Sequence, residues 1–181
     1  MKKVALVYKT KYGSTEKYAN WIAEDTGADI FKVSEIKADK LEAYNTIVYC
    51  GGLYVGGILG FSFIKKNYLK FCDKKLIVVA VGATLKKDEA IEEIKAKNFT
   101  DEMEDKVELF LLRGGLNYKK MNLIDRLLMF LLIKSVKLKK AEELDDDTKG
   151  MIATYGKVVD FTNKNAIEPI IHAINNWFAI K

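Results

Sequence analysis

Apolar residues along this chain fall into short runs that alternate with longer amphipathic segments. Residues 3–8 form a mostly continuous apolar run, which is typical of a strand covered on both faces of a sheet. Four further runs predict strands at 29–33, 46–50, 75–81 and 108–112. The segments between and after these runs predict helices over 14–25, 61–71, 88–98, 146–163 and 168–178. Gly27 is the expected C-cap of the first helix, and a second helical segment is expected to follow 88–98 as far as 106.

Strands that alternate with helices predict an α/β fold, because each helix returns the chain so that the next strand pairs in parallel. Five such strands, with a polar loop after the first, indicate a doubly wound parallel sheet in the order 2-1-3-4-5. Ligands of such sheets bind at the carboxyl ends of the strands, so we expect a site at the loops after strands 1, 3 and 4. We expect one domain over 1–181, with a basic and apolar helical segment inserted after strand 5.

The composition narrows the class of protein. Of the 181 residues, 49% are hydrophobic, which fits a globular chain. The net charge is +5, but no run of basic residues is interleaved with aromatic residues that could stack on bases, so we do not expect a nucleic-acid partner. Two cysteines, Cys50 and Cys72, are too few for a disulfide framework or a metal cluster, and we expect buried free thiols. With no export signal after Met1, the expected location is the cytoplasm.

The loop after the first strand carries the chemistry. It runs Thr10-Lys11-Tyr12-Gly13-Ser14-Thr15 into a helix, whose first N–H groups and dipole attract a phosphate. The hydroxyls of Thr10, Ser14 and Thr15 add donors, although Ser14 or Thr15 could also simply cap the helix. The glycine patterns of dinucleotide-binding folds and P-loop NTPases are absent from this loop, and Cys50-Gly51 replaces the acidic residue of a receiver domain. A monophosphate held by hydroxyls and backbone remains.

This loop resembles the phosphate loop of flavodoxins, [ST]-x-T-G-x-T, with Tyr12 at a position where that family usually has Thr and with unusual lysines at 9 and 11. The resemblance implies an FMN cofactor. Two further loops are then expected to hold the flavin ring. After strand 3, Gly51, Gly52 and Leu53 would leave room for the ring, Tyr54 would stack on it, and Gly56-Gly57 would let the backbone adjust; after strand 4 come Gly82, Ala83 and Thr84.

The segment 117–140 is both basic and apolar. It holds seven Lys or Arg and one Asp, a local charge of +6, around the apolar run 127–133. The apolar stretch of about 11 residues is shorter than the roughly 20 that span a bilayer. It fits either a helix lying on an anionic membrane surface or a helix packed on the domain with its lysines outward.

The sequence is also similar to the menaquinone-dependent protoporphyrinogen dehydrogenases, through Arg113-Gly114-Gly115-Leu116-Asn117-Tyr118 and Leu123-Ile124-Asp125-Arg126. This resemblance implies a quinone-linked FMN oxidoreductase with a porphyrinogen donor, peripheral at the inner face of the membrane. The alternatives are a flavodoxin-type electron carrier for a larger redox partner protein, against which a pI of about 9.0 argues, and a scaffold that has lost FMN. We assign no catalytic side chain, since the single histidine, His172, lies in an apolar helix.

Overall fold

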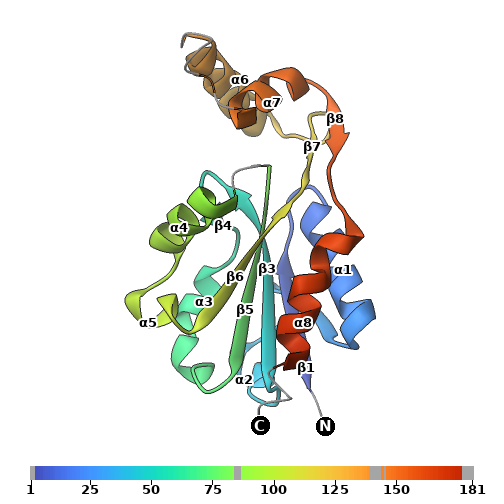
Figure 1. Cartoon of the computed structure of the whole chain (residues 1–181), viewed down its shortest axis with the longest axis vertical. Helices are drawn as coiled ribbons and strands as arrows, with labels where there is room; N and C mark the ends of the chain where they lie inside the picture. The colour runs from blue at the N-terminus through green and yellow to red at the C-terminus, as the bar shows by residue number, and fades with distance from the viewer. Residues whose placement is uncertain (1–2, 84–86, 139–143, 145, 177–181) are drawn as a thin grey trace.

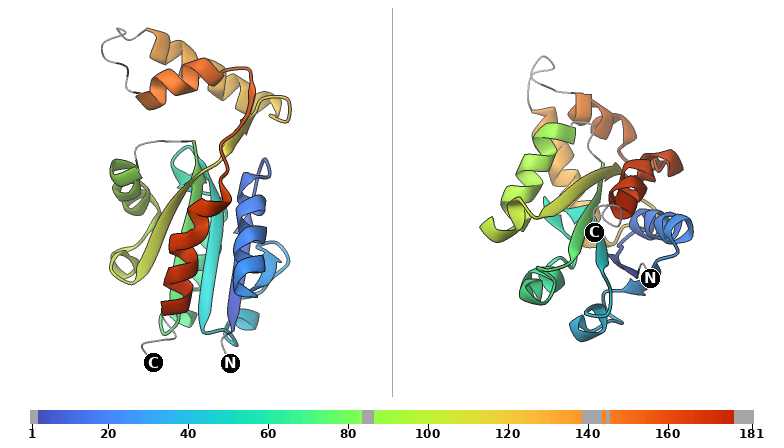
Figure 2. Two further views of the ribbon diagram at one scale, coloured as in Figure 1. Left: turned by 45° about the vertical axis from the view of Figure 1, so that its right-hand side comes forward. Right: turned by 60° about the horizontal axis from the view of Figure 1, so that its bottom comes forward.

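The chain is described from a computed structural model that covers residues 3–83, 87–138, 144 and 146–176. It contains a central sheet with helices on both faces, and a smaller helical lobe beyond one end of the sheet (Figures 1 and 2). The strands of the central sheet are β1 (Val4–Lys9), β2 (Asp29–Lys32), β3 (Thr46–Tyr54), β4 (Gly57–Ile58), β5 (Lys75–Gly82) and β6 (Val107–Arg113).

The strand order confirms the predicted fold class. The sheet runs β2-β1-β3-β5-β6 and these five strands are parallel, while the short β4 pairs antiparallel with β3. The register pairs Leu6 with Val48 and Val48 with Ile77, so these residues sit side by side across the middle strands. The fourth and fifth predicted strands are β5 and β6, so the observed order matches the predicted order 2-1-3-4-5.

Two apolar layers enclose the sheet because side chains alternate along each strand. In β3, Ile47 and Tyr49 enter one layer, whereas Val48 and Cys50 enter the other. The second layer is completed by α1 (Ser14–Thr26) and α8 (Glu168–Asn176), which lie side by side in Figure 1. The first is covered by α2 (Ala38–Leu41), α3 (Ser62–Lys66), η1 (Tyr68–Lys70), α4 (Lys87–Asn98) and α5 (Asp101–Glu104).

The lobe follows β6. The chain passes through β7 (Gly115–Asn117) into α6 (Leu123–Lys137) and α7 (Asp146–Thr154), then returns through β8 (Val158–Asp160), which pairs antiparallel with β7. The short helix η3 (Lys164–Ile167) leads into α8. The two-stranded β7–β8 ribbon therefore joins the lobe to the carboxyl ends of the sheet (Figure 2, left).

Several expected elements differ from the structure. The helix predicted over 146–163 ends at Thr154, because Gly156 is left-handed at φ 78° and the β-branched pair Val158-Val159 then extends as β8. The predicted helix 61–71 divides into α3 and η1, and β3 continues past residue 50 into the expected glycine loop. Cys50 is buried as expected, but Cys72 is exposed. Residues 177 and 178 of the last predicted helix lie outside the described residues.

Candidate functional site

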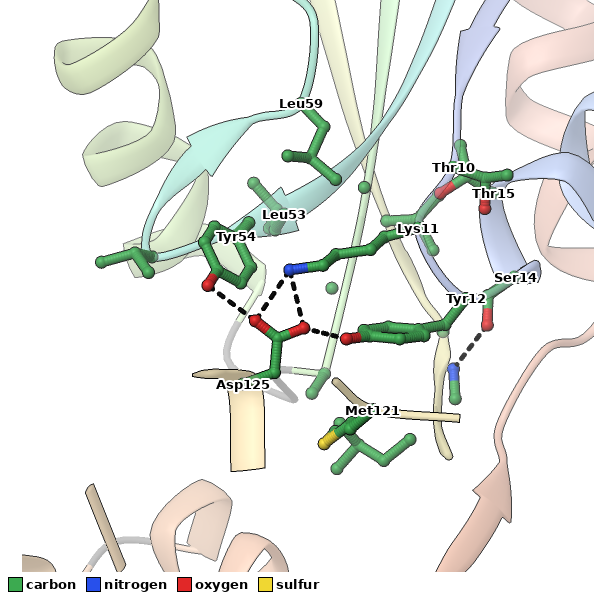
Figure 3. A pocket seen from close by; sticks show the side chains of 18 of the residues that line it. Thr10, Lys11, Tyr12, Ser14, Thr15, Leu53, Tyr54, Leu59, Met121 and Asp125 are labelled. Carbon is green, nitrogen blue, oxygen red and sulfur yellow. Dashed lines mark hydrogen bonds and ion pairs between the residues drawn. The ribbon is translucent and has the colours of Figure 1, made fainter. Parts of the chain in front are cut away.

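A cavity of about 520 Å³ opens where β1, β3, β5 and β6 end, and α6 covers it from the lobe. Figure 3 shows side chains from the loop after β1, the end of β3 and the start of α6 pointing into it. The lining residues are Thr10, Lys11, Tyr12, Ser14, Thr15, Gly52, Leu53, Tyr54, Val55, Leu59, Val81, Gly82, Ala83, Gly114, Gly115, Leu116, Met121, Asp125, Leu128, Met129 and Leu132. The cavity thus lies at the sheet edge where the strand pattern places a ligand.

The loop after β1 forms one end of the cavity. Gly13 is left-handed at φ 101°, and its N–H donates to Thr10 Oγ1 over 3.0 Å, which turns the chain into α1. Within the described residues no side chain caps the N-terminus of α1, so its first N–H groups are left for a ligand. Thr15 is buried in the first turn beside the lining residue Gly52. This arrangement of hydroxyls and unpaired N–H groups fits a phosphate.

Ser14 has a further contact. Its Oγ accepts a hydrogen bond of 3.0 Å from the N–H of Gly115, at the start of the lobe. Gly114 N–H in turn donates to Gly82 O over 2.7 Å. The predicted phosphate loop, the end of β5 and the entry to the lobe are therefore held together by main-chain and hydroxyl groups.

The second predicted loop is a β-hairpin. Leu53 pairs with Ile58 and Tyr54 with Gly57, and the two-residue turn between them has positive φ at Val55 (49°) and Gly56 (73°). Gly51 and Gly52 thus lie on β3, Gly56 in the turn and Gly57 on β4.

Of the predicted residues in this hairpin, Gly52, Leu53 and Tyr54 line the cavity, whereas Gly51, Gly56 and Gly57 do not. A Cβ on Gly51 would stand 2.3 Å from Ile58 Cγ2, so this glycine serves the close approach of β4. After β5, Gly82 and Ala83 line the cavity, and Thr84 lies outside the described residues. Gly13 shapes the first loop without itself lining the cavity.

Asp125, in the first turn of α6, is the main site residue that the sequence analysis did not assign to the cofactor. Its side chain is 5% exposed. The Lys11 ammonium lies 2.7 Å from both carboxylate oxygens, the Tyr54 hydroxyl donates over 2.8 Å, and the Tyr12 hydroxyl donates as well (Figure 3). Asn122 Oδ1 accepts from the Asp125 N–H over 2.8 Å and so caps α6.

Lys11 also lies over one face of the Tyr54 ring, the ring that was expected to stack on the flavin. Its Nζ lies 3.9 Å from the Tyr54 ring centroid, a cation–π distance. Burial lowers the pKa of Lys11, but the hydrogen bond and charge of Asp125 outweigh this, so its pKa lies above the ordinary lysine value. The ammonium therefore stays charged at neutral pH.

The lobe helix α6 has two different faces. Asp125, Leu128, Met129 and Leu132 recur at helical spacing and face the cavity. The opposite face carries large apolar side chains that are exposed: Leu123, Ile124, Leu127, Phe130 and Leu131. None of the helices within the described ranges is long and apolar enough to cross a membrane.

The lone histidine is separate from the cavity. His172 lies on α8 and lines a smaller surface groove with Asp25 and Lys164. Burial raises the pKa of the Cys50 thiol, which points into the core. Neither residue lines the cavity.

Comparisons with known proteins place this geometry in a family. The sequence model of the flavodoxin domain matches residues 5–143. An uncharacterized protein of Methanocaldococcus jannaschii is 33% identical over 73 residues, which are 40% of this chain, and the chain spans about 45% of that protein.

Solved structures with a similar fold have low sequence identity. An oxidised flavodoxin 2 from Bacillus cereus is 14% identical, with a TM-score of 0.47 over 97% of this chain and 99% of that one. A flavoprotein in complex with FMN from Lactobacillus acidophilus is 11% identical, with a TM-score of 0.41 over 62% of this chain and 93% of that one.

The family match covers most of the chain and includes all three predicted loops as well as α6. The uncapped N-terminus of α1, the hydroxyls beside it and the apolar cavity next to them fit the phosphate and the ring of FMN. The FMN prediction is confirmed by this match, which leaves the reaction open. The chain therefore belongs to the flavodoxin-domain family of FMN-binding proteins.

Proposed function

We propose that this chain is an FMN-dependent oxidoreductase that passes electrons to a quinone at an anionic membrane surface, with protoporphyrinogen as the candidate electron donor. One observation carries the proposal: α6 covers the cofactor cavity with one face and exposes a large apolar surface on the other. Bound FMN would supply the redox chemistry. The protein would bind the substrate, orient it against the flavin and exclude water from the cavity.

The inner face of α6 supports an apolar substrate. Leu128, Met129 and Leu132 continue the apolar wall that Leu116 and Met121 begin at the entry to the lobe. A cavity with apolar walls and few polar groups is typical of a site for a flat, apolar molecule. The ring of a quinone has this character.

The outer face of α6 supports a membrane partner. Leu123, Leu127 and Phe130 are 81%, 56% and 50% exposed. Lys134 and Lys137 lie in the last turn of the same helix, and the net charge of the chain is positive. Exposed leucines beside lysines favour binding to a surface of anionic lipids, where the apolar side chains enter the headgroup region.

The candidate donor rests on the resemblance to the protoporphyrinogen dehydrogenases. Four residues of the motifs that carry this resemblance line the cavity: Gly114, Gly115, Leu116 and Asp125. Because residues of both motifs lie at the cofactor cavity, a role of these motifs in the reaction is favoured over a role in packing alone. The porphyrinogen assignment depends on this argument.

The proposal is tested with FMN-loaded protein, menaquinone in vesicles and protoporphyrinogen under anaerobic conditions. We expect flavin-dependent quinone reduction that is faster on anionic vesicles than on zwitterionic ones. Absence of turnover with quinones would overturn the enzyme assignment and leave an electron carrier for larger proteins as the function.

A vesicle co-sedimentation assay tests the membrane part separately. The double variant Leu127→Asp/Leu131→Asp should lose binding to anionic vesicles. Leu69→Asp is the matched control, because Leu69 is 81% exposed but lies on η1, outside the lobe. Equal binding by both variants would exclude the outer face of α6 as the contact surface.

A further inference from the structure

Only two of the described residues that line the cofactor cavity are charged, Lys11 and Asp125. They come from opposite sides, the loop after β1 and the covering helix α6, and they meet at 2.7 Å. The remaining lining residues are neutral, and most are apolar or glycine. A single ion pair therefore sits in a largely apolar cavity, where the Asp125 side chain is 5% exposed and the Lys11 side chain 30% exposed. Apolar surroundings screen a charge less than water does, so both charges act on a group that enters the cavity.

Stability alone is a weak reason for this pair. The buried Asp125 carboxylate loses hydration that its attraction to the partly exposed Lys11 only partly repays, and an apolar side chain often stabilises such a position as well or better. Here the pair is also supported by two phenols, since the hydroxyls of Tyr12 and Tyr54 both donate to Asp125. Three donors converge on one carboxylate, which fixes the position of the Lys11 ammonium beside the Tyr54 ring.

We propose that Asp125 is a positioning residue that holds the Lys11 ammonium inside the flavin cavity, and that the two opposite charges set the reduction potential of the flavin. The inference rests on the proposed FMN site. Bound FMN that received two electrons from its electron donor and one proton from the buffered solvent would gain one negative charge. Lys11 favours that charge and Asp125 opposes it, while Lys11 keeps its proton and no bond to the protein is made.

The two single variants should therefore move the potential in opposite directions. Lys11→Met removes the favourable charge and should lower the two-electron potential by about 30 mV or more, equivalent to a tenfold change in the reduction equilibrium. Asp125→Asn keeps the shape and a carbonyl that can still accept from Lys11, so the ammonium stays in place while the opposing charge is lost, and the potential should rise. The double variant should return toward the wild-type value.

Two further variants control for charge and for folding. Lys70→Met removes a lysine that pairs with Asp39 and Glu42 near α2, at the other end of the sheet, and should leave the potential unchanged. Lys11→Arg keeps the charge and should hold the potential near the wild-type value. If Asp125→Asn does not fold, the difference in potential between Lys11→Met and Lys11→Arg still tests whether the charge at this position sets the flavin potential.

Potentials are measured by anaerobic equilibration with a dye of known potential, after the flavin content of each variant is determined. Shifts of the same sign in Lys11→Met and Asp125→Asn, or shifts no larger than that of Lys70→Met, would overturn this inference while the FMN site stands. Wild-type protein that binds no flavin would instead remove the proposed function. If the ion pair only holds α6 against the loop after β1, both single variants should be less stable, and their flavin potentials should not shift in opposite directions.

Discussion

Lys11 and Tyr12 distinguish this phosphate loop from the usual flavodoxin pattern, and both bind a carboxylate far along the chain. Asp125 lies 114 and 113 residues after them. Two of the three departures in this region, Lys11 and Tyr12 but not Lys9, therefore belong to one contact with the inserted helix. In the sequence the departures are visible, but their shared partner is not, because no local pattern connects positions so far apart.

The phosphate site can be tested at a single residue by removing the hydroxyl of Thr15. Thr15→Val keeps the side-chain shape but removes a donor to a charged group, so we expect FMN affinity to fall about tenfold. The measurement is an FMN titration followed by flavin fluorescence.

Thr26→Val is the matched control for that variant. The Thr26 hydroxyl donates to Ile22 O over 2.6 Å at the other end of α1, away from the cavity. Its FMN affinity should equal that of the wild type. An unchanged affinity in Thr15→Val would show that the hydroxyl does not contact the phosphate.

Asp160 gives a pH-dependent prediction. Hydrogen bonds from Thr162 and from Lys17 hold the pKa of Asp160 at about 2, below its ordinary value. Its ionised form thus stabilises the fold above about pH 4, and this contribution disappears as the pH falls toward 2. The free energy of unfolding of the wild type should exceed that of Asp160→Asn at pH 5, and the difference should shrink toward pH 2. A difference that grows on acidification would contradict this.

At the scale of elements, the β3–β4 hairpin shows where local sequence and structure conflict. Val55 is left-handed at φ 49°, a conformation that β-branched residues rarely adopt, and its side chain is 72% exposed. The sequence predicts a loop here but no hairpin, and Val-Gly lacks the Asn-Gly or Asp-Gly signature of such hairpins. Pairing of Leu53 with Ile58 imposes the turn.

Replacing Val55 tests this strain. Val55→Asn should raise the free energy of unfolding of the flavin-free protein by about 1 kcal/mol, because Asn tolerates the left-handed region. Val158→Asn, at an exposed position of the extended strand β8, should lower it. Urea denaturation provides both values, and a loss of stability in Val55→Asn comparable to that in Val158→Asn would count against strain at Val55.

The predicted and observed elements agree best where periodicity is strong. The five parallel strands and α1 follow from apolar runs and an amphipathic repeat. The stretch over 146–163 shows the limit, because its middle reverses at Gly156 and its end pairs with β7. That pairing is a tertiary contact, which no window of sequence contains.

At the scale of the whole molecule, the cavity forms where the sheet meets the lobe. The strand order could be derived from the sequence, and it placed the three loops at one edge of the sheet. The covering of that edge by α6 could not be derived, since the sequence fits both a surface helix and a packed one. In the structure one face of α6 lines the cavity, and the other exposes apolar side chains.

The central claim is that the cavity beneath α6 holds FMN by its phosphate and its ring. Its most direct test is a pair of titrations of the flavin-free protein, one with FMN and one with riboflavin, followed by flavin fluorescence. We predict one FMN per chain and an affinity for riboflavin at least tenfold weaker, because the α1 N-terminus then lacks its phosphate. Absence of flavin binding, or equal affinity for the two flavins, would contradict the account.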